Sequence, residues 1–191
     1  MSLEKHKALA AVRARAYGEL FGCTPSAVFP PHALFQKPDD RFPIDILVYT
    51  LGTGSGDIDV AVTSGMSDQR MADPGHPHEW KRRELIQYLP KCTEGHARRL
   101  HDMAWLPLFD GLYLDTHHSV AWAHAAVAGT PWKNAFLLLP LIRSHREFDI
   151  TGRPMRGWVV VGPEGVEDDE QLTDWIGRAT RFVRSLPAQG E

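Results

Sequence analysis

Residues 44–64 read IDILVYTLGTGSGDIDVAVTS, and their pattern is the strongest indication of the fold class of the chain. Two runs rich in apolar and β-branched residues, 44–51 and 57–64, flank a five-residue link that contains three glycines. Such residues prefer strands, and a short glycine-rich link is typical of an antiparallel hairpin. A phosphate-binding loop would need a helix directly after the glycines, whereas a second strand follows here. The stretch therefore predicts a β-hairpin.

Side chains of the second run alternate, because successive residues of a strand point to opposite faces. One face is expected to carry Ile58, Val60 and Val62, and the other Asp57, Asp59 and Ala61. Two carboxylates on one face are a candidate pair for acid–base chemistry. The pattern favours the simpler interpretation, a hairpin face that is exposed to solvent.

Further strands are expected downstream of the hairpin, each within a short apolar run. The run RELIQYL at 83–89 ends at Pro90, where a strand can stop without losing a ladder hydrogen bond. The other strand candidates are 113–114, 118–122, 135–142 and 155–162.

Three segments have the periodicity of helices. In residues 2–21 the spacing predicts an inward face of Leu9, Val12, Ala16 and Leu20, with Arg13 and other basic residues on the remaining faces. Gly22 is then a helix stop.

The second helix is expected at 93–106, with Thr93 as its N-cap and Pro107 marking its end. The third is expected at 168–186, where an apolar stripe is wide enough to cover a sheet face. Between the first helix and the hairpin, a connection with five prolines predicts no regular element.

These elements predict an α+β fold, a mixed and largely antiparallel sheet flanked by helices, in a single domain. The N-terminal helix and the Pro-rich connection, 1–43, belong to the same domain as residues 44–187. A length of 191 residues suits one domain.

Composition excludes several classes of protein. The chain is 43% hydrophobic and 24% charged, which argues against disorder, and its net charge of −3 argues against a nucleic-acid binder. No stretch is apolar and long enough for a membrane span or a signal peptide. Cys23 and Cys92 alone cannot form a disulfide framework or a Cys-only zinc site. We expect a cytoplasmic protein.

Ten histidines require a metal site to be considered. One cluster is His76, His78 and Glu79 in the loop 65–81, and another is Asp115, His117 and His118, so a metal-dependent hydrolase is the alternative function. Neither cluster has a second group at a diagnostic spacing, and no HExxH motif occurs. The sequence therefore predicts no metal and no cofactor.

Nucleophilic catalysis has no better support. The chain lacks a G-x-S-x-G motif. Cys92 precedes a helix that could stabilise a thiolate, although a structural cysteine is the favoured interpretation. We predict no catalytic residue.

Three tryptophans lie in or beside expected loops, Trp80, Trp122 and Trp132. Partly exposed tryptophan is favoured at protein interfaces. With Met66 and Asp68 from the loop 65–81, these residues form the predicted contact surface for a protein partner.

Several strand ends resemble those of the suppressor of fused domain family. The turn Gly65-Met66-Ser67 and the strand Glu84-Leu85…Tyr88-Leu89-Pro90 match its motifs, and Thr116 to Ser119 match in part. Near the end, Trp158 to Val161 and Pro163 with the acidic residues after it follow the family loosely. The resemblance covers residues 44–186 and is to the bacterial single-domain type.

The resemblance implies a non-enzymatic, protein-binding domain. Bacterial relatives of this type include immunity proteins, so a toxin is one expected partner. Such a role suits a small acidic protein, because toxins that act on nucleic acids are often basic. A homodimer is a further alternative, in which the partner is a second copy.

Overall fold

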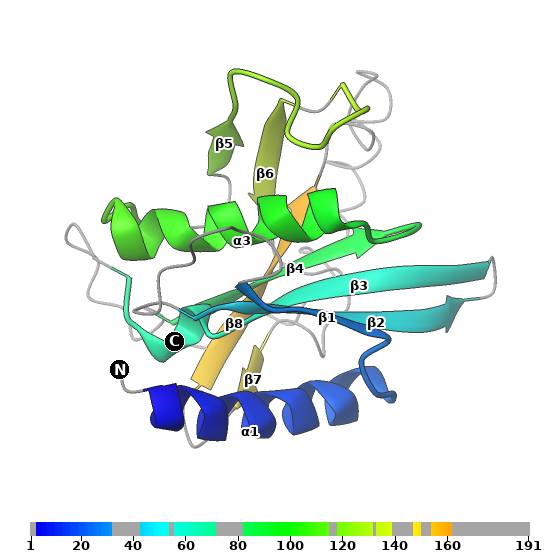
Figure 1. The fold of residues 1–191 in the computed structure, drawn as a ribbon, viewed down its shortest axis with the longest axis vertical. Coiled ribbons are helices and arrows are strands. Elements are labelled where there is room, and N and C mark those ends of the chain that lie inside the picture. Colours follow the sequence, from blue (N-terminus) through cyan, green and yellow to red (C-terminus); the bar gives the residue numbers. More distant parts are fainter. Residues whose placement is uncertain are drawn as a thin grey trace, which may run out of the picture.

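The computed structural model describes residues 3–31, 43–53, 56–71, 82–114, 118–131, 133–138, 147–149 and 154–161. Two α-helices and a large sheet make up this part of the chain (Figure 1). The third expected helix, 168–186, lies outside the described residues.

The described part contains one sheet of eight strands in the order β1-β2-β3-β4-β8-β6-β5, with β7 paired to β8. Every pairing is antiparallel except that of β4 with β8. The expected mixed, largely antiparallel sheet of an α+β fold is therefore confirmed. The strands are β1 Ala27–Phe29, β2 Asp45–Thr53, β3 Gly56–Ser64, β4 Arg83–Leu89, β5 Ser119–Ala121, β6 Asn134–Leu138, β7 Glu147–Asp149 and β8 Pro154–Val161.

The predicted hairpin is confirmed as β2 and β3, and its strands extend into the glycine-rich link until Thr53 pairs with Gly56. The strand predicted at 83–89 is confirmed with the same bounds. The segment 113–114 is not a strand, so that expectation is wrong. Burial of Leu114 by neighbouring apolar residues explains its apolar character without any strand pairing.

Helices α1, Leu3–Phe21, and α3, Glu94–Phe109, lie on opposite sides of the sheet (Figure 1). Residues Leu47, Val60 and Val62 cluster with α1, whereas Ile46 and Ala61 belong to the cluster under α3. The alternation of each strand therefore builds two apolar layers. A short 3-10 helix, η1 Met66–Asp68, follows β3.

Two helix predictions need correction. Among the side chains of α1 whose burial is described, from residue 6 onward, His6, Arg13, Tyr17 and Phe21 are buried, whereas the expected inward residues are only half-buried. The face that packs on the sheet is thus rotated by about one residue, because Arg13 has buried partners that allow it to lie inside. Pro107 does not end α3, which continues to Phe109.

The Pro-rich connection also differs from expectation, because β1 forms within it. Its three residues pair with β2 at the edge of the sheet, between Pro25 and Pro30. An edge strand needs partners on one side only, so flanking prolines are compatible with it.

Within the described residues, no helix has the length and apolar character needed to cross a membrane.

Candidate functional site

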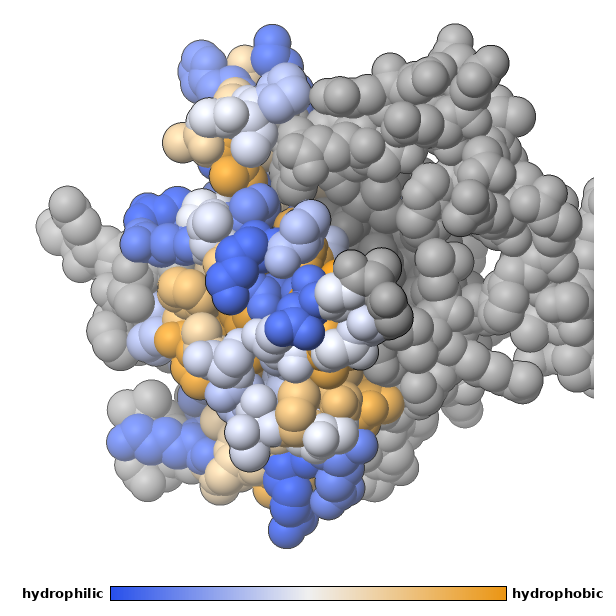
Figure 2. All heavy atoms as spheres, turned by 90° about the vertical axis from the view of Figure 1, so that its right-hand side faces the viewer, coloured by the Kyte–Doolittle hydropathy of each residue, from blue (hydrophilic) through white to orange (hydrophobic). Residues whose placement is uncertain are grey.

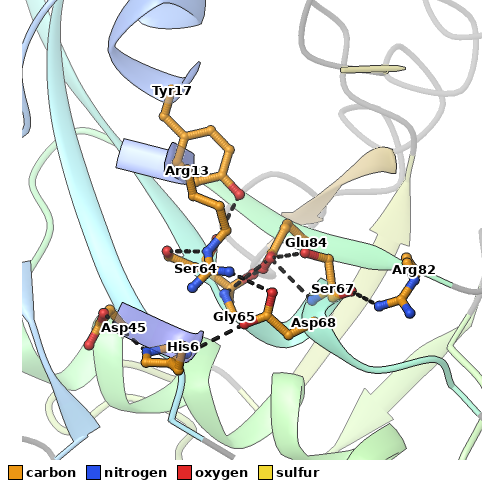
Figure 3. Close-up of polar contacts among 11 residues, drawn as sticks. His6, Arg13, Tyr17, Asp45, Ser64, Gly65, Ser67, Asp68, Arg82 and Glu84 are labelled. Atoms are coloured by element: carbon orange, nitrogen blue, oxygen red, sulfur yellow. Dashed lines mark hydrogen bonds and ion pairs between the residues drawn. The ribbon is translucent and has the colours of Figure 1, made fainter. Parts of the chain in front are cut away.

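The most concentrated group of buried polar side chains lies where β3, η1, β4 and α1 meet (Figure 3). We call it the Glu84 cluster and define it as His6, Arg13, Tyr17, Asp45, Thr63, Ser64, Gly65, Ser67, Asp68, Arg82 and Glu84. Its members come from four separate stretches of the sequence: α1, the start of β2, residues 63–68 and residues 82–84.

Glu84 is the centre of the cluster and is fully buried. One carboxylate oxygen accepts hydrogen bonds from the Gly65 N–H at 3.1 Å, the Ser67 N–H at 3.1 Å and the Ser67 hydroxyl at 2.6 Å. The other accepts from the Thr63 hydroxyl at 2.6 Å. Burial raises the pKa of Glu84, while the Arg13 charge and these hydrogen bonds oppose that rise.

Arg13 brings a positive charge into the cluster from α1. Its side chain is 1% exposed, donates to the Ser64 hydroxyl at 2.9 Å and forms an ion pair with Asp68 at 2.6 Å. A buried charge is tolerated only when it is paired in this way. The pair therefore ties α1 to the turn that follows β3.

Two further residues of α1 reach the same region. His6 Nδ1 lies 3.4 Å from an oxygen of Asp68, and its Nε2 lies 4.0 Å from Asp45. The Tyr17 hydroxyl donates to the Thr63 carbonyl at 3.2 Å, and burial raises the pKa of Tyr17. Polar contacts thus hold α1 along most of its length.

Gly65 allows the turn to close on Glu84. Its φ is 129°, and a Cβ added there would lie 2.6 Å from the Pro43 carbonyl oxygen. Only glycine fits a backbone that has this conformation and this close neighbour. Packing against the Pro43 carbonyl therefore requires glycine at the first position of the turn Gly65-Met66-Ser67.

The Glu84 cluster has a structural role and not a catalytic one. Each oxygen of Glu84 already accepts hydrogen bonds, and the carboxylate is closed to solvent, so it has no free position for a substrate proton. Its role is to hold the turn 65–68 in place and to attach α1 to the sheet.

A second polar group surrounds Asp59, which is 2% exposed, so the prediction of a solvent-exposed face is wrong there. Asp59 accepts hydrogen bonds from the Cys92 N–H and the Thr50 hydroxyl, both at 2.8 Å, and pairs with Lys91 at 3.2 Å. Burial alone would raise the pKa of Asp59, but these partners outweigh it and lower the pKa. Asp57 is exposed and lies apart from this group.

Cys92 is an unreactive thiol in this environment. Burial, with the Asp59 charge beside it, raises the pKa of Cys92 to about 11. A thiolate is the nucleophilic form of cysteine, so little of it exists near neutral pH. The structural interpretation of Cys92 is the one that the contacts favour.

The expected metal clusters lie almost entirely outside the described residues, which include only His118 of the six. Among the residues that the structure describes, no group of three His, Cys, Asp or Glu side chains could hold a metal ion.

His101 is a buried titratable group on α3, and burial lowers its pKa to about 4. Unfolded histidine has a pKa near 6.5, so below that pH the unfolded chain binds a proton that the folded chain does not. We predict that this group costs about 2 kcal/mol of stability at pH 5 relative to pH 8. Urea unfolding of the native protein and of His101→Phe should give a shallower pH dependence for the variant; parallel curves would contradict the prediction.

The predicted contact residues occupy different environments. Met66 is 1% exposed and lies in the core, and the Asp68 side chain is 6% exposed and lies in the Glu84 cluster. Neither side chain is therefore available at the protein surface. Trp80 and Trp132 lie outside the described residues. Trp122 is half-buried beside β5, where the Arg99 guanidinium lies 5.3 Å from its ring centroid.

Exposed large apolar side chains are few in the described part of the chain: Val28, Phe109 and Leu112. On the face around the β2–β3 hairpin tip, hydrophilic and hydrophobic residues are interspersed (Figure 2). The described portion of that face has no broad apolar area.

An open sheet edge is the remaining surface feature that could receive a partner. In the described sheet, β5 is the last strand and pairs only with β6. Trp122 N–H donates to the Lys133 carbonyl at 2.7 Å and Leu137 N–H to the His118 carbonyl at 2.9 Å. Because orientation alternates along an antiparallel strand, the backbone groups of Ser119 and Ala121 point away from β6.

The fold of this chain is similar to that of a solved structure, whereas comparisons of its sequence found no match. No family model and no curated protein matches the sequence. A chain of the Sufu–Fu complex crystal structure matches with a TM-score of 0.58 and 12% sequence identity, over 80% of this chain and 74% of that chain. At this identity the match shows a shared fold, as the resemblance of the strand-end motifs implies.

Proposed function

We propose that this chain binds a protein partner through its folded surface and does not transform a small molecule. The observation that carries the proposal is the fold shared with a chain from a complex of two proteins. The two buried polar groups add support, because their hydrogen-bonding capacity is used to hold α1, the turn after β3 and the start of α3 in place.

The partner is proposed to add a strand beside β5. Ser119 and Ala121 offer outward backbone groups there, and an extended peptide can pair with an open edge through main-chain hydrogen bonds. By contrast, prolines flank β1 at the other end of the sheet, and prolines at an edge strand hinder the addition of a further strand.

Trp122 is proposed as the main aromatic contact at this edge. It follows β5 directly and is held by Arg99, whose guanidinium also pairs with Asp102 at 2.9 Å. A fixed, partly exposed tryptophan is a common centre of binding energy. Trp132 and the loop that contains Trp80 complete the proposed surface, with Met66 and Asp68 supporting the start of that loop.

A finer proposal is that the partner is a toxin, which this bacterial-type domain would neutralise in the cytoplasm. The net charge of −3 suits binding to a basic protein. Cys23 and Cys92 are both free thiols, which suits a reducing compartment.

We predict that Ala121→Pro weakens partner binding about tenfold or more, because it removes one outward N–H and leaves the β5–β6 bonds in place. The partner is first captured from the native cell lysate, identified and purified, and its Kd is then measured by titration calorimetry. Ala121→Val is the matched control, since it keeps the N–H, and its Kd should stay within about twofold of the native value.

Two outcomes would argue against the proposal. Equal Kd values for Ala121→Pro and the native chain would exclude strand addition at β5. Repeated failure to capture any partner, together with stoichiometric metal in untagged protein and an activity lost on its removal, would favour the hydrolase alternative.

A further inference from the structure

Aromatic rings on α3 form a series that leads from the core to the surface. His101, Trp105 and Phe109 follow one another at four-residue spacing, with ring centroids 5.5 Å and 5.9 Å apart. Exposure rises along the series, from 1% at His101 to 60% at Phe109. The exposed Phe109 ring thus stacks on the half-buried Trp105 ring, which in turn contacts the buried His101 ring.

Leu112 extends this surface beyond the end of the helix. It is 50% exposed and follows Gly111, whose φ of 66° turns the chain after α3. Its N–H lies 3.4 Å from the Leu106 carbonyl oxygen, so it is held against the last turn. We call Phe109, Asp110 and Leu112 the α3-end patch.

The charges that the patch itself carries are negative. The carboxyl end of a helix carries a partial negative charge, and α3 has no basic residue in its last turn. Asp110 is exposed, and it is the only charged residue between Trp105 and Leu114. An apolar pair beside this carboxylate and helix end is complementary to a basic side chain with an apolar neighbour.

The α3-end patch also lies close to the proposed β5 edge. The Tyr113 ring meets the His118 ring at 6.5 Å, and His118 Nδ1 lies 3.1 Å from the Tyr113 carbonyl oxygen. His118 directly precedes β5. In Figure 1, β5 stands above α3, and the C-terminal end of α3 lies at the left.

We propose that the α3-end patch binds a basic segment of the protein partner, in which an arginine is followed or preceded closely by an aliphatic residue. The guanidinium would stack on Phe109 and pair with Asp110, and the aliphatic residue would contact Leu112. This inference rests on the proposed function, because it assigns a chemistry to the partner that adds at β5.

Random 12-residue peptides displayed on phage and selected against the full chain test this directly. We expect the enriched peptides to carry an arginine or lysine within three positions of an aliphatic residue. For the strongest synthetic peptide, Arg→Gln in the peptide should raise Kd about tenfold or more, the loss of a stacked and paired cation.

Three variants of the chain test where the selected peptide binds. Phe109→Ser and Asp110→Lys should each raise the Kd of that peptide at least tenfold, whereas Val28→Ser, an exposed apolar residue at the opposite sheet edge, should change it less than twofold. All three side chains are exposed or sit at an exposed turn, and thermal melts check that the variants are folded. Enriched peptides without basic residues, no enrichment at all, or Kd values insensitive to Phe109→Ser and Asp110→Lys would each overturn the inference.

The two proposals fail in different ways. If Ala121→Pro weakens the captured partner while Phe109→Ser and Asp110→Lys do not, strand addition stands and the basic-segment assignment falls. If none of the three substitutions alters partner binding, both proposals are wrong.

Discussion

Glu84→Ala is expected to lower the free energy of unfolding by about 3–5 kcal/mol, the usual result of removing one member of a buried, charged network. The substitution leaves four donors in the interior without their acceptor, two backbone N–H groups and two hydroxyls, from Thr63, Gly65 and Ser67. It also leaves Arg13 with one fewer negative neighbour. A loss of this size approaches the whole stability of an ordinary domain.

Urea unfolding followed by tryptophan fluorescence measures the effect. Glu94→Ala is the matched control, because Glu94 has a side chain 60% exposed and a surface ion pair with Arg98, which is expected to contribute less than about 1 kcal/mol. If Glu84→Ala does not fold, Glu84→Gln keeps an acceptor oxygen for the turn and should show a smaller loss. Similar stabilities for Glu84→Gln, Glu94→Ala and the native chain would show that the cluster contributes little.

Elements with strong local patterns were predictable from the sequence. The hairpin could be predicted because two β-branched runs and a glycine-rich link occur together, and both strands are confirmed within two residues. The N-terminus of α3 could be predicted because Thr93 is a good N-cap, and its hydroxyl does accept a hydrogen bond from the His96 N–H.

The packing face of α1 could not be predicted from hydrophobicity. The sequence predicts an outward Arg13, because arginine is rarely buried without a partner, and its partner Asp68 is 55 positions away in the sequence. A signal was present in the spacing, since His6, Arg13, Tyr17 and Phe21 share one helix face. The polar partners of that face lie in the end of β3 and in the turn that follows it.

Only part of the Glu84 cluster could be predicted from the sequence. Gly65, Met66, Ser67 and Glu84 belong to the strand-end motifs that the sequence shows, and in the structure Glu84 accepts hydrogen bonds from the Gly65 and Ser67 N–H groups. The contribution of α1 was missed, because contacts between distant segments leave no local periodicity. For the same reason β1 was missed, since its three residues are defined by pairing with β2.

Arg13→Met is expected to destabilise the protein by about 3–5 kcal/mol, because it leaves Asp68 buried without its 2.6 Å partner. Arg15→Met is the matched control on the same helix; Arg15 is exposed, so its replacement should cost less than about 0.5 kcal/mol.

A double-mutant cycle tests whether the cost comes from an uncompensated charge. Asp68→Leu alone should also be costly, because it leaves the buried Arg13 without its ion-pair partner. The double variant should lose at least about 2 kcal/mol less than the sum of the single losses, since a pair replaced by apolar residues leaves no orphaned charge. Additive losses in urea unfolding would instead mean that Arg13 and Asp68 stabilise α1 independently, and that the ion pair is not what docks this helix on the sheet.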